Sequence, residues 1–198
     1  ATGAFILQKP GLGTAPSVGG AASDLIGPLH FGDFAGTLSK AVWFSLAFCC
    51  AYVTLSGMLL WTQRRQEVPV WRRLGLVSIW VGYGLPASLA SVALAYFLAR
   101  AAGYGSYEWM LAGFLIAVGL AAVITMVTRD PRRWLLTATG ALLLVLPLVR
   151  WLSGGPSWVA LAESGVALVI AIDVAILVGG GFAFRSAYRA THTSTASL

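Results

Sequence analysis

His30 has the most informative surroundings among the few chemically versatile side chains of this sequence. It lies in the segment LHFGDFAG, residues 29–36, where Gly32 and Gly36 would let a bulky planar group or another backbone approach closely. A haem held by two histidines needs imidazoles on opposite faces of its ring. The other histidine, His192, lies in the Thr/Ser-rich end of the chain. His30 is therefore either an interfacial residue or one half of a ligand pair.

Three ionisable residues lie within or beside apolar runs, where a charge costs several kcal/mol unless it is paired. Asp173 is about fifteen residues into the last run, or roughly 22 Å from its outer end along a helix. One interpretation is that Asp173 fixes the register of its helix through hydrogen bonds. The alternative is that it takes part in a proton relay or contacts a partner subunit. Glu163 and Arg150 lie near the outer ends of consecutive runs, so we expect an interfacial ion pair, with substrate binding as the lesser alternative.

The remaining residues exclude several kinds of chemistry. Cys49 and Cys50 are adjacent inside an apolar run and lack the spacing of a zinc or iron–sulfur site, so we interpret them as packing residues. The sequence contains no nucleophile elbow and no phosphate-binding loop. The net charge of +6 does not indicate nucleic-acid binding, because the basic residues lie between long apolar runs.

The composition is that of a membrane protein. Hydrophobic residues make up 58% of the chain and charged residues only 10%, against about 25% charged in soluble domains. Every apolar run is long enough to cross about 30 Å of hydrocarbon as a helix, and no run alternates as a barrel strand does. We therefore predict an all-α bundle of five transmembrane helices, near Ala41–Thr62, Leu74–Leu98, Trp109–Val127, Trp134–Leu152 and Trp158–Phe184.

The basic residues predict the orientation. Nine arginines fall on one side of the predicted membrane, against Lys9, Lys40, Arg100 and Arg150 on the other. The positive-inside rule then puts the N-terminus outside and the C-terminus in the cytoplasm. We expect residues 1–40 to be a periplasmic linker and interfacial segment, 41–184 the bundle and 185–198 a cytoplasmic tail. Because residues 1–40 hold no segment that would carry them across, we also expect a signal or an earlier helix upstream.

Small residues at helical spacing predict where helices approach one another, since membrane helices associate by close packing. We interpret two such stripes as bundle contacts, with a lipid or cofactor groove as the alternative. The stripes are Glu163, Ala167, Ala171, Ala175 and Gly179 on the fifth run, and Gly113, Ala117 and Ala121 on the third.

Several segments together resemble a known family. The segment 29–36 is followed by an apolar run that contains TLSGM at 54–58 and ends in WTQRR at 61–65, and the next run contains GLPA at 84–87. This order resembles that of PepSY-associated transmembrane proteins, also called iron-regulated membrane proteins. The resemblance covers about residues 25–153.

The resemblance implies a multi-pass protein of the bacterial inner membrane, with a periplasmic PepSY module before a helical block. Some members are similar to siderophore-iron reductases, which pass electrons through membrane haem to ferric chelates. His30 matches the family's outer-side histidine, a haem ligand, with Gly32 and Gly36 beside it. By this resemblance the chain would contribute to binding haem b, with a second ligand outside the sequence, and to ferric or siderophore reduction when complete.

The partners expected are the lipid bilayer, the PepSY region or another membrane subunit, and no nucleic acid. An alternative from another class is a non-catalytic accessory subunit packed against a larger respiratory or photosynthetic complex. A proton-coupled transporter using Asp173 is disfavoured, because the sequence has one deep carboxylate and no internal repeat.

Overall fold

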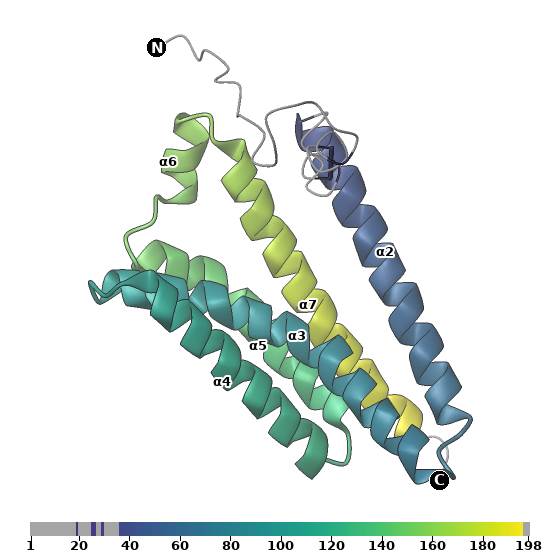
Figure 1. Ribbon diagram of the computed structural model, residues 1–198. Coiled ribbons are helices and arrows are strands. Elements are labelled where there is room, and N and C mark those ends of the chain that lie inside the picture. Colours follow the sequence, from purple (N-terminus) through teal and green to yellow (C-terminus); the bar gives the residue numbers. More distant parts are fainter. Residues whose placement is uncertain (1–18, 20–24, 27–28, 30–35, 196–198) are drawn as a thin grey trace. The chain divides into compact units, whose positions relative to one another are not determined.

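The described part of the chain is helical. A computed structural model describes residues 19, 25–26, 29 and 36–195, and no strand forms among them. Figure 1 shows the long helices and the short helix α6, with bounds α2 Gly36–Gln63, α3 Pro69–Ala101, α4 Ser106–Val127, α5 Pro131–Leu152, α6 Trp158–Glu163 and α7 Ala167–Thr195. Within the described residues, five helices are long and apolar enough to cross a membrane. The predicted all-α architecture with five transmembrane helices is confirmed.

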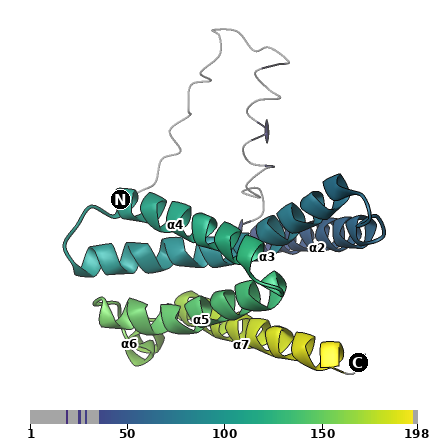
Figure 2. The same cartoon turned by 90° about the horizontal axis from the view of Figure 1, so that it is seen from below.

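The chain divides into two compact units, residues 1–57 and residues 58–198. The second unit contains the last turn of α2 and all of α3 to α7. Within it, α3 packs against α4 and α5, and α5 packs against α7. Figure 2 shows the pair α3 and α4 stacked on the pair α5 and α7. Each of the helices α3 to α7 therefore has at least one long neighbour in this unit.

Small residues bring α3 and α4 together. A Cβ added to Gly84 of α3 would lie 2.9 Å from the Cβ of Ala121, and one added to Gly113 of α4 would lie 2.8 Å from the Cβ of Ala95. The hydroxyl of Ser91 donates a hydrogen bond to the carbonyl of Gly113 at 3.0 Å. The small residues predicted on the third run, Gly113 and Ala121 among them, therefore mark a packing surface against α3.

The face of α7 that meets α5 differs from the predicted stripe. Asp173 and Gly180, two helical turns apart, lie on the buried side, whereas Ala171 and Ala175 are exposed. A Cβ on Gly179 would touch α5 only at ordinary contact distance, 3.9 Å from Leu143. The stripe is therefore not the close contact with α5, which is made by Gly180 and by the paired carboxylate of Asp173. Whether the stripe contacts another helix stays a prediction.

The predicted fifth run is broken near its start. Helix α6 ends at Glu163, and α7 begins at Ala167 after a turn in which Gly165 has a φ of +72°. That left-handed conformation favours glycine and ends the helix. Glu163 therefore does not lie on α7. At the other end, α7 continues to Thr195 and includes most of the segment 185–198 predicted as a tail.

The second unit has two chemically different ends. Its antiparallel helices place the turn at 64–68, the turn at 128–130 and the last turns of α7 at one end, and the connections 102–105 and 153–157 at the other (Figure 1). We call the first the arginine-rich end. It contains the nine arginines on which the predicted orientation rests, at positions 64, 65, 72, 73, 129, 132, 133, 185 and 189.

Candidate functional site

The carboxylate of Asp173 lies at the centre of a buried polar cluster opposite the arginine-rich end. Its Oδ2 accepts hydrogen bonds from Nη2 of Arg150 at 2.7 Å and from Nε of Arg150 at 3.2 Å. The indole Nε1 of Trp158 donates to the same oxygen at 2.8 Å. The side chains of Arg150 and Asp173 are only 12% and 5% exposed. Three donors from two elements therefore bind one buried carboxylate oxygen, and the guanidinium group of Arg150 neutralises its charge.

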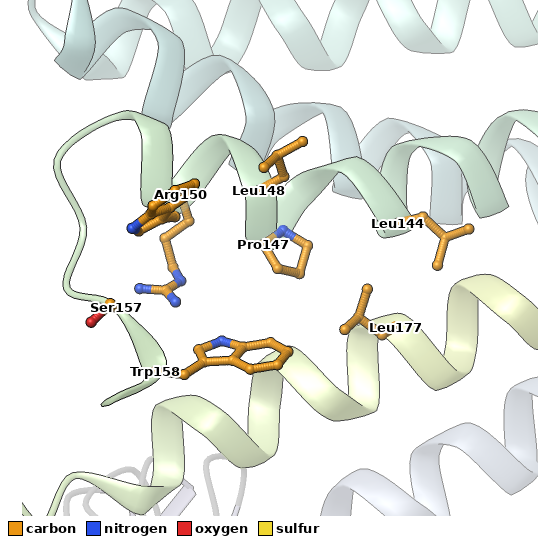
Figure 3. A pocket seen from close by; sticks show the side chains of 8 residues that line it. Leu144, Pro147, Leu148, Arg150, Ser157, Trp158 and Leu177 are labelled. Atoms are coloured by element: carbon orange, nitrogen blue, oxygen red, sulfur yellow. The ribbon is translucent and has the colours of Figure 1, made fainter. Parts of the chain in front are cut away.

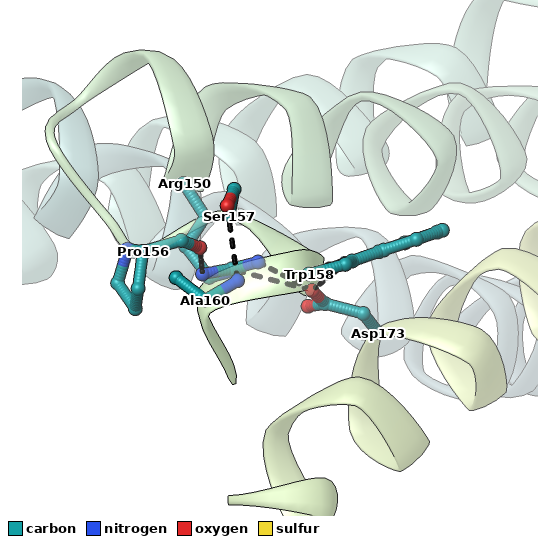
Figure 4. A network of polar contacts seen from close by, with 6 residues as sticks. All are labelled: Arg150, Pro156, Ser157, Trp158, Ala160 and Asp173. Carbon is teal, nitrogen blue, oxygen red and sulfur yellow. Dashed lines mark hydrogen bonds and ion pairs between the residues drawn. The ribbon is translucent and has the colours of Figure 1, made fainter. Parts of the chain in front are cut away.

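The connection after α5 holds Arg150 in place. The Nη1 of Arg150 donates to the carbonyl of Pro156 at 3.0 Å, and the backbone N–H of Gly155 donates to the carbonyl of Arg150 at 3.0 Å. A Cβ on Gly155 would lie 2.6 Å from that carbonyl oxygen, so only glycine fits there. Gly154 has a φ of +84° and turns the chain back. Figure 4 shows the resulting network around the guanidinium group.

Helix α6 directs Trp158 toward the carboxylate. Ser157 precedes the helix in an extended conformation, and its hydroxyl oxygen accepts the backbone N–H of Ala160 at 3.3 Å. This N-cap fixes Trp158 as the first residue of α6. Its indole then reaches Asp173 across the connection between α6 and α7. A helix of only six residues is thus tied to α7 by one side-chain hydrogen bond.

An open, largely apolar cavity lies next to the cluster. Its volume is about 390 Å³. Figure 3 shows the indole of Trp158 and the side chains of Pro147 and Leu177 around it, with the guanidinium group of Arg150 at one edge. Leu144, Leu148 and Trp151 complete most of the apolar lining. Such a cavity suits an apolar group of modest size.

The arrangement favours structural support over catalysis. The carboxylate and guanidinium groups are paired with each other, and the hydroxyl of Ser157 is used as a helix cap. A buried ion pair of this kind holds its elements in one register, because separating the charges in a low-dielectric surrounding is costly. Of the two interpretations left open for Asp173, register fixation is therefore the one that its contacts favour.

Two details of the sequence prediction for this region are wrong. Arg150 pairs with Asp173 instead of Glu163, which lies exposed at the end of α6. Asp173 is also nearer the end of its helix than predicted, since it lies six residues after Ala167, or about 9 Å along the axis. The physical reason for both is the break at Gly165, which starts α7 later and removes Glu163 from it.

The predicted haem-binding residues fall mostly outside the described part of the chain. His30 and Gly32 are not among the described residues, and Gly36 begins α2 with a φ of +61°. Residues 36–189 contain no histidine, and the described residues contain no group of three or more His, Cys, Asp or Glu that could hold a metal ion. The described helices therefore do not supply the histidine pair that a bis-histidine haem needs.

Sequence reasoning did not identify the contributions of Trp158 and Pro156. The sequence predicts Trp158 only as the start of a long membrane span. The contact with Pro156 is made by its backbone carbonyl, which every residue has, so the residue type gives no signal for it. The Ser164-Gly165 dipeptide was the available signal, because Ser-Gly pairs mark turns and a break there frees the preceding segment to fold back.

Comparison with known proteins identifies a family model that matches part of the chain. The model of the PepSY-associated TM region matches residues 8–64, a segment that includes His30 and the helix α2. The resemblance stated from the sequence is confirmed for this segment, and its extension to about residue 153 stays a prediction. No curated protein and no solved structure matches the chain.

Proposed function

We propose that this chain, which carries a PepSY-associated TM region at residues 8–64, is the helical block of a bacterial inner-membrane protein that takes part in haem-linked electron transfer or ferric-siderophore reduction. The observation that supports the proposal most is the extent of this match, because it includes the outer-side segment with His30 as well as the first transmembrane helix.

The proposed orientation places His30 on the periplasmic side. Nine arginines share the arginine-rich end of the second unit, whereas Arg100 and Arg150 belong to the opposite end. Since short cytoplasmic loops carry an excess of Lys and Arg, the arginine-rich end is the cytoplasmic one in this account. An imidazole just before the first helix would then face the compartment where ferric chelates arrive.

His30 would supply one ligand to the haem iron, and a residue outside this sequence would supply a second. Haem, when bound, provides the one-electron chemistry that a membrane reductase needs. The chain itself would contribute the imidazole, the small residues Gly32 and Gly36 beside it, and a low-dielectric helical surrounding. No step of the reaction is assigned to the described helices.

The ion pair of Arg150 and Asp173 has a supporting role in this proposal. It joins α5 to α7 near the periplasmic ends of both helices and leaves neither charge free for proton transfer. The helical block would thereby keep a fixed packing of α5 against α7.

The experiment that tests the proposal is a reduced-minus-oxidised visible spectrum of the purified complete protein. We expect a Soret band that is lost or strongly reduced in His30→Ala and unchanged in His192→Ala, which removes the other histidine of this chain. A complete protein without a Soret band, or a band that His30→Ala leaves unchanged, would remove the haem assignment.

A second candidate is a non-catalytic accessory subunit of a larger membrane complex. It is favoured by the exposed alanines at 167, 171 and 175, which form a thin face of α7 that α5 does not use. Copurification with a stable complex, together with no redox centre in this chain, would favour this candidate over the first.

A further inference from the structure

A second cavity, of about 290 Å³, lies at the arginine-rich end of the residue 58–198 unit. Its walls come from the last turn of α2, from α3 and from the first turn of α5. Arg72 and Arg132 line it together with the amide side chains of Gln63 and Gln66 and the phenol of Tyr83. Among the described residues that line the cavity, none is acidic. Its polar part therefore presents hydrogen-bond donors and positive charge.

Neither arginine is neutralised within the described part of the chain. No ion pair joins Arg72 or Arg132 to a described carboxylate. The nearest acidic residue in sequence to Arg132 is Asp130, whose Oδ1 caps α5 by accepting the backbone N–H of Arg133 at 3.2 Å. The guanidinium carbon of Arg132 lies 5.2 Å from the ring centroid of Tyr83, a cation–π contact that orients it. Two guanidinium groups thus remain available to an anion.

Two side-chain contacts join the last turn of α2 to the start of α3 beside the cavity. The rings of Trp61 and Trp71 meet edge to face with centroids 4.3 Å apart, which ties the end of α2 to the start of α3. A Cβ on Gly75 would lie 3.4 Å from Oγ1 of Thr62, whose hydroxyl donates to the carbonyl of Met58 within its own helix. The cavity is therefore a built feature of the helix junction.

The apolar part of the lining identifies the kind of anion. Leu59, Leu76 and Ile79 line the same cavity and belong to helices that are long and apolar enough to cross a membrane. A ligand that fills both parts needs an anionic head and a hydrocarbon tail. Basic pockets between transmembrane helices recognise lipid headgroups in this way.

We propose that this cavity binds the phosphate headgroup of an anionic phospholipid, with its acyl chains along the apolar wall. The planar guanidinium groups of Arg72 and Arg132 would donate paired hydrogen bonds to the phosphate oxygens. The inference does not depend on the haem assignment, because it uses no residue before Met58. In the proposed orientation the lipid belongs to the cytoplasmic leaflet.

The test is a lipid titration of the full chain in detergent, read by native mass spectrometry, with dioleoylphosphatidylglycerol, dioleoylphosphatidylcholine and inorganic phosphate as separate probes. We expect phosphatidylglycerol to bind at least about tenfold more tightly than phosphatidylcholine. Both lipids carry a phosphate, but the choline ammonium of phosphatidylcholine cancels its charge and would be repelled by the two arginines, whereas phosphatidylglycerol keeps a net negative charge. Inorganic phosphate at the same concentration should not displace it. Equal binding of the two lipids, or displacement by free phosphate, would overturn the assignment.

Matched double variants separate this cavity from the general charge of its surroundings. Arg72→Gln with Arg132→Gln should weaken phosphatidylglycerol binding about tenfold or more. Arg73→Gln with Arg133→Gln removes the same charge from the adjacent positions, which do not line the cavity, and should change binding by less than about threefold. Equal losses in both variants would show a diffuse surface effect and contradict the proposal.

A measurement on the unmodified protein keeps the test valid if the first double variant does not fold. Phosphatidylglycerol with a diazirine in its headgroup should label peptides that contain residues 59–83 or Arg132 after illumination. Labelling confined to other peptides would overturn the proposal.

Discussion

Gly140 of α5 and Gly180 of α7 lie with their backbones in direct apposition. A Cβ on Gly140 would be 3.0 Å from the carbonyl oxygen of Gly180, and a Cβ on Gly180 would be 3.2 Å from the carbonyl oxygen of Gly140. Lipid gives no hydrophobic reason for two helices to associate, so such close backbone contact is a main source of their packing. The ion pair of Arg150 and Asp173 lies on the same two helices, nearer the ends that lie opposite the arginine-rich end.

Gly140→Ala should destabilise the α5–α7 pair by about 1–3 kcal/mol, the usual cost of overpacking a tight contact. The added methyl group would lie 2.7 Å from Cδ2 of Phe184 as well as against the backbone of Gly180. Thermal unfolding in detergent would measure the change. Gly119→Ala is the control, because a Cβ there meets no atom within 4 Å and should be tolerated. Equal stability of the two variants would contradict the contact.

Asp173→Ala should cost about 3–5 kcal/mol, because it leaves the guanidinium group of Arg150 buried without its counter-charge. The free energy of unfolding, measured in mild detergent, is the appropriate readout. Glu163→Ala removes an exposed carboxylate from the preceding helix and should have little effect. If both variants lost the same stability, the assignment of Asp173 as the partner of Arg150 would be wrong.

A paired replacement separates ion pairing from simple loss of charge. Arg150→Met combined with Asp173→Leu should recover most of the stability lost in Asp173→Ala, since a well-packed apolar pair often equals a buried ion pair. A double variant no more stable than Asp173→Ala would indicate that the cluster needs these polar groups for another reason.

Trp158→Phe should destabilise the α6–α7 region by about 1.5–3 kcal/mol, the range for a hydrogen bond to a charged group. It keeps an aromatic ring in the cavity while removing the indole N–H that donates to Asp173. Trp151→Phe, at another position of the same cavity lining, serves as control and should change stability less. Hydrogen exchange of the α6 amides would locate the effect.

The sequence was sufficient to predict what depends on hydrophobic length. The runs predicted to end near Thr62, Leu98, Val127 and Leu152 all correspond to single helices, because about 20 apolar residues have few other stable conformations in lipid. The small residues on α4 likewise predicted a helix contact, since Gly113 packs directly against α3.

The polar cluster could not be predicted in the same way. The sequence shows that Asp173 is costly to bury, but it does not identify the partner of this carboxylate. The partner depends on the residue at which α7 begins, and the left-handed conformation of Gly165 determines that residue. Hydropathy averages over about 20 residues and does not detect a three-residue turn. Once the break is known, Arg150 at the end of α5 is the natural partner for a carboxylate two turns into α7.

The proposed orientation of the chain underlies both the proposed periplasmic position of His30 and the leaflet proposed for the lipid site, and thiol labelling tests it most directly. In a background of Cys49→Ser and Cys50→Ser, a cysteine would be introduced by Gln66→Cys at the arginine-rich end or by Tyr104→Cys at the opposite end. A membrane-impermeant maleimide added to intact spheroplasts should label the Tyr104→Cys protein at once and the Gln66→Cys protein only after permeabilisation. Labelling of Gln66→Cys in intact spheroplasts, with Tyr104→Cys protected, would contradict the account.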